Sequence, residues 1–142
     1  YHVGSVSWSM KYFPGGQFTA QAFHTAEIAA KVVFDDAINT YRRDAWEVAY
    51  GSSGTVGAVD EVLTGAGWPA GSVTREGLDW LMEGMLKARS ADGLRLDGLR
   101  EDRRAVIGGG VISRIRSTVR ICSSLRSCVV MGATLTTANA RL

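Results

Sequence analysis

One short run of residues combines small and hydroxyl-bearing side chains in a way that could bind an anion: Gly51-Ser52-Ser53-Gly54-Thr55. Glycine lets the backbone approach a ligand without a clash from a Cβ atom, and the three hydroxyl groups can donate hydrogen bonds. A helix that begins at the end of the run would add free N–H groups and a partial positive charge. The run therefore predicts a phosphate-binding loop.

The run lies between two predicted elements that would hold it in place. Residues 46–50 are mostly apolar, which predicts a short strand, and apolar residues then recur at helical spacing from Thr55 to about Ala66. A strand, a glycine-rich turn and a helix together form an anion site. The same residues also suit an ordinary tight turn with Thr55 as the N-cap, and spacing alone leaves both interpretations open.

A second turn of the same kind is predicted near the end of the apolar part of the chain. A short strand is predicted at Ala105, Val106 and Ile107, and Gly108-Gly109-Gly110 follows it directly. Ligands of open α/β sheets bind beyond the carboxyl ends of the strands. Two strand-to-glycine turns therefore predict a shared crevice.

The remaining pattern is mainly helical. Thr19 can cap a long helix that reaches Tyr41, and Thr74 can begin another with leucines and methionines on one side. Apolar and polar residues alternate from Val6 to Tyr12, which predicts a half-buried strand. Asp35 and Asp36 are adjacent on the first helix and point in different directions, so we expect a solvated face rather than a catalytic pair.

Length and composition are those of one globular domain. The 142 residues are 46% hydrophobic and 21% charged. No apolar run reaches the roughly 18 residues that span a bilayer, and no leader precedes the first element, so we expect a cytoplasmic protein without membrane contact. The first residue is Tyr1, and Val3 to Met10 resemble the interior of a fold, so we expect a fragment of a longer protein.

Acidic and basic residues are unevenly distributed along the chain. All 14 acidic residues lie at or before Asp102, whereas residues 112–142 carry five arginines and no acid. The arginines do not keep one helical face and no aromatic residue accompanies them, so we do not expect nucleic-acid binding. Cys122 and Cys128 have the spacing of neither a zinc knuckle nor a redox pair, and isolated thiols are expected.

Three segments in order carry a family resemblance. They are Val3–Gly16, with Gly-Ser-Val-Ser-Trp and Lys-Tyr-Phe-Pro-Gly-Gly, Trp46–Val56, with Gly-Ser-Ser-Gly-Thr, and Asp97–Val111, with Asp-Gly-Leu, Arg103, Arg104 and Val-Ile-Gly-Gly-Gly. Together they resemble the exopolyphosphatase and guanosine pentaphosphate phosphohydrolase family. The Tyr-Phe-Pro-Gly-Gly turn favours the exopolyphosphatase branch.

The resemblance implies a fold. It is α/β, part of an actin-like, ribonuclease-H-like ATPase-type domain of two lobes, with strands alternating with helices. Residues 1–111 would be most of the second lobe of the catalytic core. The resemblance also implies a helix from about Val6, and we adopt it in place of the alternating strand.

The resemblance further implies a reaction: Mg²⁺-dependent hydrolysis of the terminal phosphoanhydride of polyphosphate or guanosine pentaphosphate, in a protein that often forms a homodimer. Gly51 to Thr55 would be a phosphate-binding loop facing the cleft, and Gly108 to Gly110 a packing turn near it. The catalytic glutamate and the residues that help hold phosphate and Mg²⁺ would lie upstream of Tyr1. We therefore expect this chain alone to be inactive.

Residues 112–142 depart from the family, and only Gly132-Ala133 matches its expected turn. Their composition is typical of a shifted reading frame in a GC-rich gene, so we interpret them as an atypical tail, with a frame error near Gly110 to Ser113 as a hypothesis. A second interpretation of the whole chain is a non-catalytic phosphate-binding or interaction module. An upstream lobe bearing a glutamate would favour the enzyme, and its absence the module.

Overall fold

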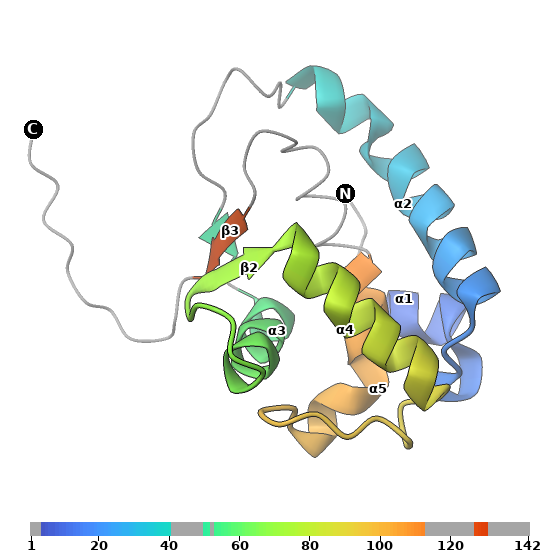
Figure 1. Ribbon diagram of the computed structural model, residues 1–142. Coiled ribbons are helices and arrows are strands. Elements are labelled where there is room, and N and C mark those ends of the chain that lie inside the picture. The colour runs from blue at the N-terminus through green and yellow to red at the C-terminus, as the bar shows by residue number, and fades with distance from the viewer. Residues whose placement is uncertain (1–3, 41–49, 52, 113–126, 131–142) are drawn as a thin grey trace, which may run out of the picture.

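The computed structural model describes residues 4–40, 50–51, 53–112 and 127–130, with side chains excluded at residues 36–40 and 127–130. Helices dominate this part of the chain (Figure 1). They are α1 (Ser5–Tyr12), the short turn η1 (Pro14–Gly16), α2 (Ala20–Thr40), α3 (Gly54–Gly65), α4 (Arg75–Ala88) and α5 (Glu101–Gly110). The strands are β1 (Tyr50–Gly51), β2 (Ser72–Thr74) and β3 (Ser127–Val130).

The three strands form one small mixed sheet in the order β1-β3-β2. The central strand, β3, pairs parallel with β1, where Tyr50 lies opposite Val129, and antiparallel with β2, where Val73 lies opposite Cys128. The strand predicted at residues 46–50 therefore has its last residue in β1, whereas residues 46–49 lie outside the described part. No strand was predicted for β3, which belongs to residues 112–142.

The hydrophobic core lies between the helices rather than on the sheet. An aromatic group closes one end of it, with the rings of Phe13 and Phe23 centred 4.8 Å apart and Phe18 beside both. The other end is aliphatic, and α3 and α4 contribute many of its fully buried side chains: Val59, Val62, Leu63, Leu78, Leu81 and Met85. Helix α5 lies against both α1 and α3 (Figure 1).

Two helix starts agree with the sequence. The Oγ1 atom of Thr19 accepts a hydrogen bond from the backbone N of Ala22 (3.1 Å) before α2, and Thr74 accepts one from Gly77 (3.0 Å) before α4. Hydroxyl side chains at this position satisfy a backbone donor that the helix leaves free. At α3 the cap is Ser53 rather than Thr55, so the N-cap interpretation of Thr55 is wrong.

The first segment is helical. The family resemblance implies this helix, whereas the alternation of apolar and polar residues predicted a strand. Val6 and Met10 are 55% and 71% exposed, whereas Trp8 and Ser9 are buried. A strand would have put Val6, Trp8 and Met10 on one face. The helix instead buries Trp8 and Ser9, and Ser9 contacts Gly109 of α5.

Residues 105–110 are also helical, so the predicted strand and the turn at Gly108 to Gly110 are both wrong. Glycine inside a helix costs about 1 kcal/mol relative to alanine. Here the three glycines let α5 approach its neighbours closely, because a Cβ atom would meet aromatic rings at Gly108, the backbone of α1 at Gly109 and a side chain of α3 at Gly110. The glycine run therefore serves packing.

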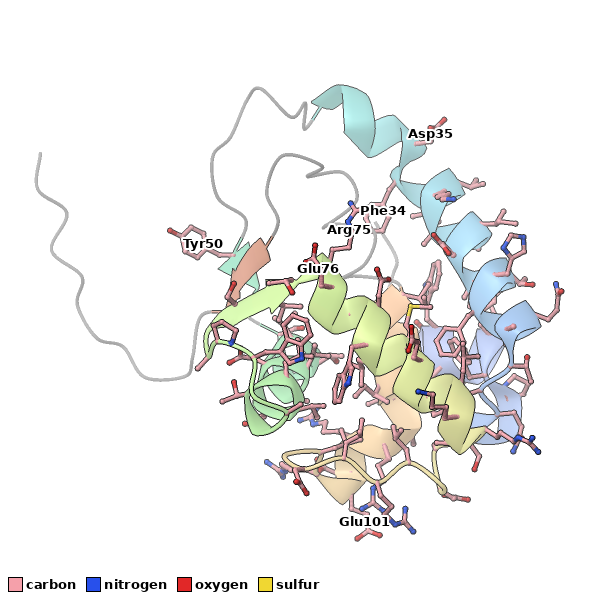
Figure 2. All side chains as sticks on the ribbon, in the orientation of Figure 1. Phe34, Asp35, Tyr50, Arg75, Glu76 and Glu101 are labelled. Atoms are coloured by element: carbon pink, nitrogen blue, oxygen red, sulfur yellow. The ribbon has the colours of Figure 1, made fainter. Side chains whose placement is uncertain are left out.

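Two side chains examined in the sequence are exposed (Figure 2). Asp35 points away from the body of the protein on α2, as predicted for a solvated face, and the side chain of Asp36 lies outside the described part. Tyr50 on β1 is likewise exposed. Within the described residues, no helix combines the length and the apolar character needed to cross a membrane.

Candidate functional site

The amino end of α3 presents backbone donors. Ser53 has extended backbone angles, its Oγ atom accepts from the N–H of Val56 (3.3 Å), and its carbonyl accepts from the N–H of Gly57 (3.1 Å). The N–H groups of Gly54 and Thr55 are the first two of the helix and have no acceptor within it. Gly54 is exposed. Two donors therefore stand at the positive end of the helix dipole.

The two glycines of the run are explained by neighbouring side chains. A Cβ atom on Gly51 would lie 2.6 Å from Cγ1 of Val56, so this position must be small for β1 to meet α3. A Cβ atom on Gly54 would lie 3.2 Å from Nη1 and 3.3 Å from Nη2 of Arg103. Gly54 therefore admits the guanidinium group of Arg103 to the amino end of α3.

The other members of the run occupy different environments. Thr55 is 5% exposed, and its methyl group lies against Gly110 of α5. Its side chain is thus part of the packing between the two helices, and its backbone N–H remains the group that could meet a ligand. Ser52 lies outside the described residues.

Arg103 reaches this end of α3 from the first turn of α5. Its side chain is 38% exposed, and its Nε atom lies 3.4 Å from Oδ2 of Asp102. The same carboxylate lies 3.2 Å from Nε of Arg100. One negative charge is therefore shared by two arginines, and within the described part of the chain no carboxylate pairs with the Nη atoms of Arg103. The local charge is positive.

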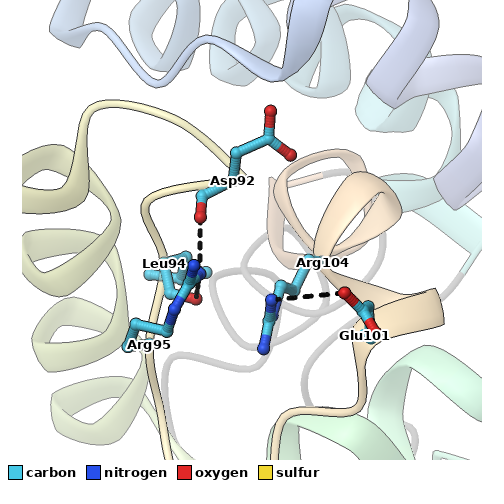
Figure 3. A network of polar contacts seen from close by, with 5 residues as sticks. All are labelled: Asp92, Leu94, Arg95, Glu101 and Arg104. Carbon is cyan, nitrogen blue, oxygen red and sulfur yellow. Dashed lines mark hydrogen bonds and ion pairs between the residues drawn. The ribbon is translucent and has the colours of Figure 1, made fainter.

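The neighbouring arginine points elsewhere (Figure 3). Nη1 of Arg104 lies 3.9 Å from Oε1 of Glu101 on the same helix, and Arg95 donates to the carbonyl of Leu94 (3.2 Å) and to that of Asp92. Of the arginine pair at 103 and 104, only Arg103 approaches Gly54. Both arginines belong to the segments that carry the family resemblance, which assigned them no role, and the usable signal was their place directly before an apolar and glycine-rich segment.

The two glycine runs meet, although not as predicted. The expected crevice between two strand-to-glycine turns is wrong, since Gly110 ends a helix and packs on Thr55. The contact nevertheless brings α5, and with it Arg103, to the amino end of α3. Ser53, Gly54, Thr55 and Arg103 are thus the residues that the structure gathers.

These residues do not fit a magnesium site. Mg²⁺ prefers carboxylates and water in octahedral geometry, and the carboxylate beside Arg103, that of Asp102, is engaged by two arginines. Over residues 4–35, 50–51 and 53–112, no three His, Cys, Asp or Glu side chains gather to hold a metal ion. The arrangement can instead bind an oxyanion through two N–H groups and a guanidinium.

The chain is similar to the members of one protein family. The sequence profile of the Ppx/GppA phosphatase family matches residues 1–119. A Haemophilus influenzae protein described as "Putative exopolyphosphatase" is 33% identical over 110 residues, which cover 78% of this chain and 34% of that protein. Two proteins described as guanosine-5'-triphosphate,3'-diphosphate pyrophosphatase, from Aeromonas hydrophila and Pseudoalteromonas translucida, are 33% and 31% identical over 110 residues, or 78% of this chain and 22% of each. The chain thus spans about a third or less of the length of these relatives.

Proposed function

This chain belongs to the Ppx/GppA phosphatase family, and we propose that it supplies one phosphate-binding wall of an enzyme that hydrolyses the terminal phosphoanhydride of inorganic polyphosphate. The wall consists of the N–H groups of Gly54 and Thr55, the hydroxyl group of Ser53 and the guanidinium group of Arg103.

One observation carries the proposal: the guanidinium group of Arg103 lies at the amino end of α3. A cation and the positive end of a helix dipole repel each other when nothing negative lies between them. A phosphate oxygen at this point would accept charge-assisted hydrogen bonds from Arg103 and from the first N–H groups of the helix. An oxyanion would thus turn an unfavourable pairing into a favourable one.

The chemistry available here is binding and charge stabilisation. Hydrolysis of a phosphoanhydride spreads negative charge over the phosphoryl oxygens, and fixed donors lower its energy. None of the four residues is suited to be a general base, because a guanidinium group only donates, Gly54 has no side chain, Ser53 caps the helix and Thr55 is buried. In this proposal the base that activates water and the ligands of Mg²⁺ come from the parts of family proteins outside this chain.

Polyphosphate and guanosine pentaphosphate both present a terminal phosphate on a phosphoanhydride, so the same wall suits either. The Tyr-Phe-Pro-Gly-Gly turn at residues 12–16 supports polyphosphate, and this is the substrate we propose. The Aeromonas and Pseudoalteromonas relatives carry the name of the guanosine-nucleotide enzyme. That similarity makes guanosine pentaphosphate the second candidate.

Titration calorimetry with tripolyphosphate tests the wall. We expect saturable binding to the chain and a loss of about tenfold or more in affinity for Arg103→Ala, because charge-assisted hydrogen bonds to phosphate are strong. Lys87→Ala removes the same charge from an exposed position on α4 and should leave affinity unchanged. Equal losses in the two variants would mean diffuse electrostatic attraction, and absent binding would remove the proposal.

A further inference from the structure

A buried hydrogen bond joins two helices that are far apart in the sequence. The Oγ atom of Ser9 on α1 accepts from the backbone N–H of Gly109 on α5 at 3.0 Å. Ser9 is 4% exposed. Hydroxyl groups are seldom buried without a partner, and this one is used at the contact between α1 and α5.

Glycines form the α5 side of this contact. Gly108 faces the rings of Phe13 and Phe18, and Gly109 lies against the backbone of α1 at Ser5 and Ser9. Helices normally fix their relative position by interlocking the side chains of both partners. Three consecutive glycines offer no side chains of their own for this, so directional contacts gain importance for the position of α5 along α1. The hydrogen bond between Ser9 and Gly109 is one such contact.

The same helix carries the cation of the candidate site. Arg103 lies less than two turns before Gly109 on α5, and Gly110 meets Thr55 at the amino end of α3. A shift of α5 along α1 therefore moves the guanidinium group relative to Gly54. The ion pair between Arg103 and Asp102 would not oppose that shift, because both residues lie on α5.

We propose that Ser9 is a positioning residue: its hydrogen bond to Gly109 holds α5 in the register that keeps Arg103 at the amino end of α3. The inference rests on the proposed function, since it concerns the same phosphate-binding wall. It gives a binding role to a residue that is remote from the ligand and lies on another helix.

The test is a double-mutant cycle on this chain, with tripolyphosphate as the probe and calorimetry as the readout. Ser9→Ala should weaken binding about fivefold, the size expected for a lost buried hydrogen bond. In the background of Arg103→Ala the same change should have no further effect, because Ser9 acts through Arg103. A merely structural role would weaken binding equally in both backgrounds and would overturn the proposal.

Two further variants make the result specific. Ser7→Ala removes a hydroxyl group from the exposed side of the same helix, where it bonds only to the carbonyl of Gly4 among the described residues, and should leave affinity unchanged. Ser9→Cys keeps nearly the same volume with a weaker acceptor, and its affinity should fall between those of the parent chain and Ser9→Ala. If Ser9→Ala fails to fold, Ser9→Cys carries the same cycle.

The outcomes separate this inference from the proposed function. Saturable, Arg103-dependent binding that Ser9→Ala and Ser9→Cys leave unchanged would contradict the positioning role alone. A parent chain that does not bind tripolyphosphate would remove both. Non-additive losses in the cycle, with Ser7→Ala unchanged, would support both.

Discussion

The guanidinium group of Arg103 lies so close to Gly54 that a Cβ atom at this position would be 3.2 Å from Nη1. This relationship joins the first turn of α5 to the amino end of α3, 49 positions earlier in the sequence. It gives Gly54 a definite physical reason to be glycine. A single methyl group added at Gly54 would also change the position of the positive charge at the site.

Gly54→Ala should therefore separate folding from binding. Alanine is the better helix former by about 1 kcal/mol, and the flexible end of Arg103 can move, so we expect little change in the free energy of unfolding. The displaced guanidinium should weaken tripolyphosphate binding by about fivefold. Gly57→Ala, where no atom lies within 4 Å of the new Cβ, is the matched control and should bind normally. Unchanged affinity in Gly54→Ala would show that Arg103 does not act from this position.

Removal of the α3 cap should affect both stability and binding. Ser53→Ala takes the acceptor from the N–H of Val56 and should lower the free energy of unfolding by about 1 kcal/mol in urea denaturation. Thr74→Ala removes the corresponding cap of α4 at a similar cost. Only the Ser53 variant should weaken tripolyphosphate binding. Equal effects of the two variants on affinity would assign Ser53 a purely structural role.

The close contact between α1 and α5 predicts a larger loss of stability. In Gly109→Ala the new Cβ atom would collide with the carbonyl of Ser5 and the backbone N of Ser9, and backbone atoms cannot turn aside as side chains do. We expect a loss of about 3 kcal/mol in the free energy of unfolding. Gly84→Ala on α4 meets no atom within 4 Å and should stabilise the chain by about 0.5 kcal/mol. A stable Gly109→Ala variant would contradict the described helix contact.

The chain by itself should not turn over substrate. The candidate site offers donors for an oxyanion but no group that activates water, so phosphate release from polyphosphate with Mg²⁺ should equal the rate without protein. A malachite green assay at several concentrations of the chain measures this. Release that grows with protein concentration would mean that a catalytic group lies within these 142 residues.

Local chemistry made several elements predictable. Thr19 and Thr74 each precede an amphipathic stretch, and both cap the helices expected there. The glycine and serine run does join β1 to the start of α3, because such a run before apolar residues at helical spacing marks a helix start. Its phosphate binding stays a prediction. These features depend on residues close together in the chain.

Tertiary contacts explain the errors. Three glycines after an apolar triplet favour a turn locally. At residues 108–110 they instead allow α5 to pack closely on Phe13, Ser9 and Thr55. None of these three residues is near the glycines in sequence. The alternation from Val6 to Tyr12 failed for the same reason, since the face that is buried depends on α5. Arg103 had no assigned role because its partner, Gly54, belongs to another element. Residues 112–142 were interpreted as an atypical tail, and within them only Ile112 and β3 are described.

The most direct test is a ¹H–¹⁵N correlation spectrum of the chain titrated with tripolyphosphate. If the amino end of α3 and Arg103 form the phosphate-binding wall, the amide signals of Gly54 and Thr55 and the Nε–H signal of Arg103 will shift the most and will saturate together. Signals of Gly54, Thr55 and Arg103 that stay in place at saturating tripolyphosphate, or that drift without saturation, would contradict the account.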